Sequence, residues 1–148
     1  MKPTLLCALA AIAISGCGTE PVALEKLPPV DSAEAGEVVL VRPRAFIGER
    51  ADIGEQGIVY VVNIDQKDIA ELGPRQHQRF KLSAGEHRIA MRCFVSFSGW
   101  NETAITHRVV AGETAYLAVT PKHSCANVEP VPESKGRQLL SSTVPRPG

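Results

Sequence analysis

Residues 76–95 read QHQRFKLSAGEHRIAMRCFV, and polar and apolar side chains alternate along both halves of this stretch. In the first half the apolar positions alternate in phase with Phe80, and in the second half they alternate in phase with Ile89. A period of two is typical of β-strands that bury one face and expose the other. Residues 83–86, Ser-Ala-Gly-Glu, have the chemistry of a tight turn in which Gly85 can adopt a positive φ. The stretch therefore predicts two strands joined as a hairpin.

Short strands with turn residues between them are also expected on both sides of this segment. Residues 58–64 are apolar on both parities, which is typical of a central strand covered on both faces. The other expected strands cover residues 38–41, 69–72, 103–110, 114–120 and 128–131. Residues 111–113 repeat the string Ala-Gly-Glu and predict a second hairpin with the same turn. About seven or eight strands of this spacing, with a short helix near residues 134–140, indicate an all-β fold, a small antiparallel β-sandwich.

The N-terminus has the features of an export signal. Lys2 precedes an uncharged apolar run that ends at Ile14, and this run is much shorter than the roughly 20 residues that span a bilayer. The segment Ile-Ser-Gly-Cys at residues 14–17 resembles the bacterial lipobox, although that pattern prefers Leu where this chain has Ile14. The resemblance implies cleavage after residue 16 and lipidation of Cys17 with diacylglyceryl and palmitate groups. Ordinary secretion, with Cys17 free or paired, is the alternative.

The lipobox also implies a location and a domain organisation. Gly18 follows the acceptor where an Asp would be typical of inner-membrane retention, so we expect a protein of the cell envelope, anchored in the outer membrane and facing the periplasm. Residues 17–36 contain three prolines and no sustained period, and we expect a lipidated Cys followed by a flexible tether. The β-sandwich domain is then expected over residues 37–142 and a disordered tail over 143–148.

Several strings of the mature chain resemble a group of bacterial lipoproteins. These proteins contain a domain of unknown function related to PEGA-type β-sandwich modules. The matching strings are VLVRP (39–43), YVVNID (60–65), LSAGEH (82–87), VAGETAYL (110–117) and SKGRQLL (134–140). The usual turn has Pro before its Gly, where this chain has Ala84. The resemblance implies a β-sandwich of the cell envelope and supplies no catalytic residues.

Composition excludes one class of partner. The chain has 16 Lys+Arg and 16 Asp+Glu, so its formal net charge is zero. Nucleic-acid binding depends on a basic excess that neutralises phosphates, and we therefore expect no nucleic-acid partner. Histidines lie at spacings unlike those of a ligand pair, and no nucleophile–base motif is present, so we expect no catalytic, cofactor-binding or metal site.

Two cysteines remain in the domain after the signal is removed and Cys17 is lipidated. Because the periplasm is oxidising, we expect Cys93 and Cys125 to form a disulfide. The alternative is that each is a separately buried small hydrophobic residue.

Within each half of residues 76–95, the basic residues also occur at alternate positions. If its two strands form a hairpin, five basic side chains share one sheet face and form a candidate site for an anionic ligand such as a glycan carboxylate or a phosphate. These residues are His77, Arg79, Lys81, Arg88 and Arg92. The alternative is a solvated outer face whose long side chains cover apolar strand surface.

The leading functional hypothesis is a non-catalytic, membrane-anchored lipoprotein of the cell envelope, a binding or structural module whose partner is an envelope protein or an anionic glycan. An accessory or inhibitor protein that docks on an envelope enzyme through a loop around Trp100 is the alternative. Trp100 lies in the turn-like segment 98–101. It is either a stacking platform for a sugar or, as is more common, a rim residue that closes the core. A hydrolase is the third hypothesis, against which the absence of a nucleophile–base motif counts.

Overall fold

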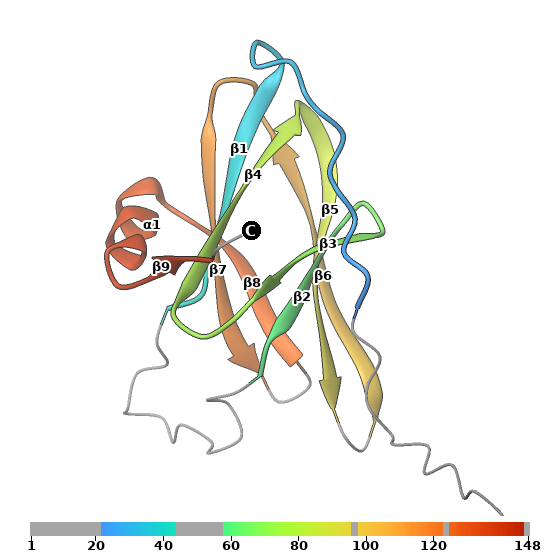
Figure 1. Ribbon diagram of the computed structural model, residues 1–148. Coiled ribbons are helices and arrows are strands. Elements are labelled where there is room, and N and C mark those ends of the chain that lie inside the picture. The colour runs from blue at the N-terminus through green and yellow to red at the C-terminus, as the bar shows by residue number, and fades with distance from the viewer. Residues whose placement is uncertain (1–21, 44–57, 96–97, 123–124, 147–148) are drawn as a thin grey trace, which may run out of the picture.

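The computed structural model describes residues 22–43, 58–95, 98–122 and 125–146 (Figure 1). The expected signal peptide of residues 1–16 and the expected lipid acceptor Cys17 lie outside these ranges. Within them, no helix has the length and apolar character needed to cross a membrane.

Two β-sheets pack face to face, and the expected all-β sandwich with a short C-terminal helix is confirmed (Figure 1). The first sheet has the order β8-β7-β1-β4-β9, and the second sheet has the order β3-β2-β5-β6. The first sheet is mixed, since β1 pairs with β7 and β4 pairs with β9 in parallel. The strands of the first sheet are β1 (Ala35–Val41), β4 (Gln76–Ser83), β7 (Thr114–Lys122), β8 (Cys125–Val131) and β9 (Val144–Pro145). Those of the second sheet are β2 (Tyr60–Ile64), β3 (Lys67–Leu72), β5 (Gly85–Val95) and β6 (Gly99–Val109).

The core lies between the sheets and takes mostly alternate residues from the strands. Strands β1, β4, β7 and β8 contribute from the first sheet, and β2, β3, β5 and β6 contribute from the second. The fully buried members include Val38, Leu40, Leu117, Val62, Ile64, Ile89 and Met91. Strand β2 is buried at all five positions, as expected of a central strand covered on both faces.

Neither Ala-Gly-Glu string forms the expected hairpin. Strand β4 pairs with β1 and β9, whereas β5 pairs with β2 and β6. The chain therefore crosses from the first sheet to the second between β4 and β5. It crosses back between β6 and β7, because β7 pairs with β1 and β8.

The two crossings are short connections tied to the start of β1. Only Ala84 separates β4 from β5, whereas the tightest common hairpin needs two loop residues. The amide of Ala84 donates to the carbonyl of Glu34, and the amide of Gly112 donates to the carbonyl of Ala35. Both strings do share a glycine with positive φ, 139° at Gly85 and 78° at Gly112. The repeated string thus marks repeated sheet crossings.

A hairpin is found between β2 and β3. Its two turn residues, Asp65 and Gln66, have φ values of 49° and 70°. Two consecutive positive φ values are characteristic of a type I′ turn, whose twist matches that of the flanking strands. The β-bulge between Val62 and Asn63 shifts the register of this pair.

Helix α1 (Glu133–Leu140) covers part of the outer face of the first sheet, as the expected helix at residues 134–140 anticipates (Figure 1). Val39, Val41 and Tyr116 are buried there beneath Leu139 and Leu140. The helix comes close because its one buried residue is a glycine. A Cβ atom at Gly136 would overlap Cβ and Cγ of Tyr116.

Both ends of the domain extend beyond the expected boundaries. Strand β1 begins at Ala35, before the expected start at residue 37. Upstream of it, the amide of Glu25 donates to Asp68 of β3, and Leu27 packs against the core. The expectation of a disordered tail is wrong for residues 143–146, because β9 pairs with β4 and Arg146 forms an ion pair with Glu71.

Cys93 and Cys125 lie at disulfide distance, with a Cα–Cα distance of 5.7 Å, in agreement with the expected pairing. Cys93 belongs to β5 and Cys125 to β8, so this bond joins the second sheet to the first. Close by, the Tyr60 hydroxyl donates to the Cys125 carbonyl at 3.2 Å, and the buried Arg42 guanidinium lies 4.2 Å from the Tyr60 ring centre. The sheets are therefore tied together at this end by a covalent bond and a buried polar contact.

Replacing Gly136 with Ala is expected to destabilise the protein. Helix propensity alone predicts a gain of about 1 kcal/mol, but the new methyl group would collide with the base of the Tyr116 side chain, at a cost of about 1–3 kcal/mol. Guanidinium denaturation measures the difference. Ser134→Ala, on an exposed position of the same helix, is the matched control and should change stability little. A more stable Gly136→Ala protein would contradict the packing described.

Removing the disulfide is expected to lower the free energy of unfolding. The bond closes a loop with a sequence separation of 32, for which chain entropy gives about 3.5–4 kcal/mol. The double substitution Cys93→Ala and Cys125→Ala should lower the denaturation midpoint, and added reductant should then have no further effect on it. An unchanged midpoint in the double variant would show that the two thiols are not paired.

Candidate functional site

The expected basic face does not exist as one surface. Because the chain crosses between sheets after β4, His77, Arg79 and Lys81 lie on the outer face of the first sheet. Arg88 and Arg92 lie on the outer face of the second sheet, on the opposite side of the core. The hairpin assumption behind the expected anionic-ligand face is therefore wrong, and these five residues cannot contact one ligand.

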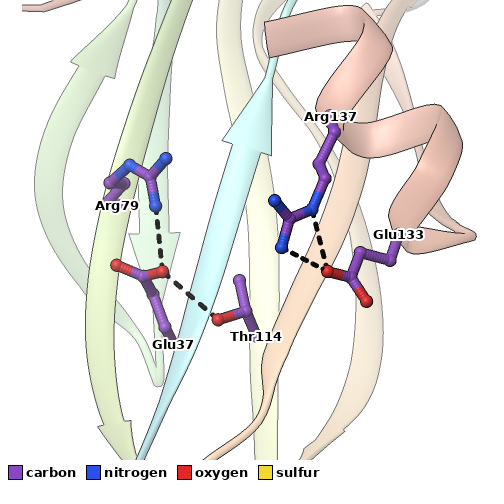
Figure 2. A network of polar contacts seen from close by, with 5 residues as sticks. All are labelled: Glu37, Arg79, Thr114, Glu133 and Arg137. Atoms are coloured by element: carbon purple, nitrogen blue, oxygen red, sulfur yellow. Dashed lines mark hydrogen bonds and ion pairs between the residues drawn. The ribbon is translucent and has the colours of Figure 1, made fainter.

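Two of the three cations of the first sheet, Arg79 and His77, are also engaged or weakened. Arg79 forms an ion pair of 2.9 Å with Glu37 of β1, and Thr114 of β7 donates to the same carboxylate oxygen at 3.4 Å (Figure 2). His77 contacts the Thr143 hydroxyl at 2.9 Å. Burial, and secondarily the nearby charge of Arg79, lowers the pKa of His77. With His77 neutral and Arg79 paired, the exposed Lys81 is the cation of this set that stays available to an anion near neutral pH.

The outer face of the second sheet contains a shallow hollow of about 490 Å³. Strands β2, β5 and β6 and the β2–β3 turn supply its lining, and two ion pairs neutralise its charge. Arg88 pairs with Glu102 of β6, and Arg92 pairs with Asp68 of β3. The lining residues are Asn63, Gln66, Arg88, Arg92 and Glu102. We call this set the polar hollow.

Arg92 connects the polar hollow to an aromatic pair. Its guanidinium carbon lies 4.9 Å from the centre of the Trp100 ring, a cation–π distance. Trp100 also packs edge-to-face on Phe94, with ring centres 5.8 Å apart. Phe94 is 47% exposed and Trp100 is 45% exposed. An exposed aromatic surface and a polar recess are thus adjacent on one sheet face.

Trp100 lies in a strand, although the sequence pattern places it in a loop. It is the second residue of β6 and pairs directly with Phe94 of β5. Strand pairing fixes the backbone positions from which both rings project. The expectation that Trp100 lies in a docking loop is therefore wrong. Residues 96–97 of that segment lie outside the described residues.

Asn63 lies in the lining of the polar hollow with an incomplete set of hydrogen bonds. Its side-chain amide donates to Asp68 at 2.7 Å. The Asn63 Oδ1 atom is buried and finds no hydrogen-bond partner among the described residues. An unsatisfied buried acceptor costs roughly 1–3 kcal/mol, and such atoms often mark a position where water or a ligand binds. Asn63 is only 5% exposed, so it is held rigidly.

Asp65, His87 and Ser83 form a second polar group. They contact one another in the sequence Asp–His–Ser, as in a catalytic triad, but their hydrogen-bond geometry differs from that of a triad. Asp65 Oδ2 lies 2.7 Å from His87 Nδ1, and the Ser83 hydroxyl lies 3.5 Å from His87 Nε2. However, Nε2 is only 2.9 Å from the Ser83 carbonyl oxygen, to which it must donate. A nitrogen that carries this proton cannot accept one from the serine. We interpret the trio as a clamp that holds the β2–β3 turn against the crossing from β4 to β5.

Metal binding finds no support within the described ranges, where no three His, Cys, Asp or Glu side chains are grouped to hold an ion. His123, next to the expected disulfide, lies outside these ranges. Comparison of the chain with family models, curated proteins and solved structures found no match.

Sequence reasoning found Arg88, Arg92 and Trp100 but missed their partners. Asp68 and Glu102 form the ion pairs of the hollow, and Asn63 completes its lining. Asn63 was detectable, because it is the one polar side chain in the otherwise apolar residues 58–64. The two acids gave no local signal, since their importance depends on which strands become neighbours.

Proposed function

We propose that this chain is a non-catalytic cell-envelope lipoprotein that binds a glycan on the outer face of the second sheet. The observation that carries the proposal is the position of Arg92, between the exposed Trp100 ring and the Asp68 carboxylate. The Arg92 side chain therefore links the apolar Trp100 ring to the polar side chains of the hollow. Sugars present this combination of an apolar ring face and hydroxyl groups at its rim.

The aromatic pair supports stacking on a sugar ring. Aromatic side chains give large contact areas at a small cost in conformational entropy, and the edge-to-face packing of Trp100 on Phe94 favours this orientation of the rings before a ligand arrives. The disulfide strengthens this arrangement, since Cys93 lies between Arg92 and Phe94 in β5 and points into the core. Preorganisation of this kind increases affinity because less freedom is lost on binding.

The charge balance of the polar hollow favours a neutral sugar over the anionic ligand expected from the sequence. Arg88 and Arg92 already have carboxylate partners, with which an anionic ligand would have to compete. A hydroxyl or acetamido group can instead accept from a guanidinium and donate to the neighbouring carboxylate without separating the pair.

The lipid anchor explains why such a face would be useful. A protein held at the membrane through Cys17 samples only the nearby envelope, so a weak glycan site acts at a high effective concentration. The resemblance to PEGA-type envelope modules supports the same assignment. Docking on an envelope enzyme stays the alternative, in which Phe94 and Trp100 would contact protein.

Replacing Trp100 with Ala is expected to weaken glycan binding at least about fivefold, because stacking on aromatic rings contributes roughly 1–3 kcal/mol. Pull-down of the full-length protein with purified peptidoglycan, and titration with neutral amino-sugar oligosaccharides, measure this. Val144→Ala is the matched control, since Val144 is also an exposed apolar residue but lies in β9 of the first sheet. No binding by the wild-type protein, or equal losses in both variants, would contradict the proposal.

Replacing Cys17 with Ala is expected to block lipidation and cleavage. The full-length precursor should accumulate, and it should not incorporate radiolabelled palmitate during growth in a bacterial host. Mass spectrometry of the N-terminus distinguishes the precursor from a cleaved product. Labelling of the variant, or a wild-type protein that retains Met1, would overturn the lipoprotein assignment.

A further inference from the structure

Strand β6 is an edge strand with the features of a pairing surface. It terminates the second sheet, spans 11 residues from Gly99 to Val109, and pairs with β5 without a register shift. It contains no proline. Unpaired amides and carbonyls along such an edge are a template for another strand.

The other described edges are protected by devices that β6 lacks. Strand β3 follows a β-bulge and receives a hydrogen bond from Glu25. Strand β8 contains Pro130, and β9 has only two residues. Bulges, prolines and short length are the usual means of preventing edge-to-edge association.

The exposed residues of β6 are complementary to themselves in one antiparallel register. Glu102 and Arg108 are equidistant in sequence from Ile105, on either side of it, and so are Trp100 and Val110. All four flanking residues are exposed. If Ile105 lies opposite its own counterpart, Glu102 of one copy faces Arg108 of the other, and Trp100 faces Val110. Each contact then occurs twice, as a two-fold interface requires.

We propose that β6 pairs antiparallel with β6 of a second copy of this chain, in the register centred on Ile105. Arg108 makes no ion pair with any described residue, and Glu102 would place its carboxylate between Arg88 of its own copy and Arg108 of the second copy. Cross-strand pairs of opposite charge stabilise a sheet. Trp100 and Val110, which are 45% and 46% exposed, would cover each other. A register centred one residue earlier, on Ala104, would instead place Arg108 opposite Trp100 and Glu102 opposite Thr106.

Such a dimer would have one continuous sheet. The two-fold axis of an antiparallel edge pair runs perpendicular to the sheet, so the outer faces of both second sheets point in the same direction. Both polar hollows would lie on that shared face. The dimer shares Glu102 and Trp100 with the site proposed for the glycan, whereas Arg108 lies outside that site, so a change at Arg108 tests the dimer separately from glycan binding.

Reversing one charge tests the interface. Sedimentation equilibrium of the full-length protein in density-matched detergent should show a dimer at micromolar concentration. Arg108→Glu places acid opposite acid twice and should weaken dimerisation at least about tenfold. Lys135→Glu, the same charge reversal on an exposed position of α1, should leave the dimer intact. A monomeric wild-type protein, or an unaffected Arg108→Glu dimer, would overturn the proposal.

Cysteine cross-linking tests the register with variants that preserve the charges. Ala104 and Thr106 are exposed, and the proposed register places each opposite the other in the partner copy. A mixture of Ala104→Cys and Thr106→Cys proteins should form a mixed disulfide dimer on mild oxidation, identified by mass spectrometry. Cross-linking of Ala104→Cys with itself in preference to the mixture, or no cross-link in the mixture, would refute this register.

Discussion

The packing of two apolar rows against each other determines every exposed feature of this protein. Once Leu40 and Phe80 point inward from the first sheet, and Ile89 and Met91 point inward from the second, the alternate side chains must point outward. Cations of β4 and cations of β5 then lie on opposite sides of the molecule. The two sheet crossings, fixed by hydrogen bonds to the start of β1, determine this division.

The sequence predicted the elements of the fold better than their pairing. Strand positions, the short helix and the disulfide followed from local signals: alternation, β-branched runs, and two cysteines in a chain expected to be exported. The hairpin at Gly85 was wrong because a turn residue with positive φ suits a sheet crossing as well as a hairpin. The ordered tail was missed because Val144 and Arg146 are held by partners in β4 and β3, far away in sequence.

The candidate site shows the same division between local and non-local information. Arg92 and Trp100 were identifiable as residue types suited to recognition, but their meeting depends on the register of β5 against β6. Asp68 enters the site only because β3 lies beside β2. The core, the disulfide and the aromatic pair all meet around Cys93, so the element that joins the sheets also positions the groups that we assign to ligand recognition.

The central claim is that recognition occurs on the outer face of the second sheet. Nuclear magnetic resonance of the isotopically labelled protein, titrated with neutral peptidoglycan-derived sugars, tests it most directly. The account predicts shifts confined to Asn63, Arg92, the Trp100 indole and their strand neighbours, with the amides of α1 unchanged. Shifts centred on α1 and Arg79 instead, or none at saturating sugar, would contradict it.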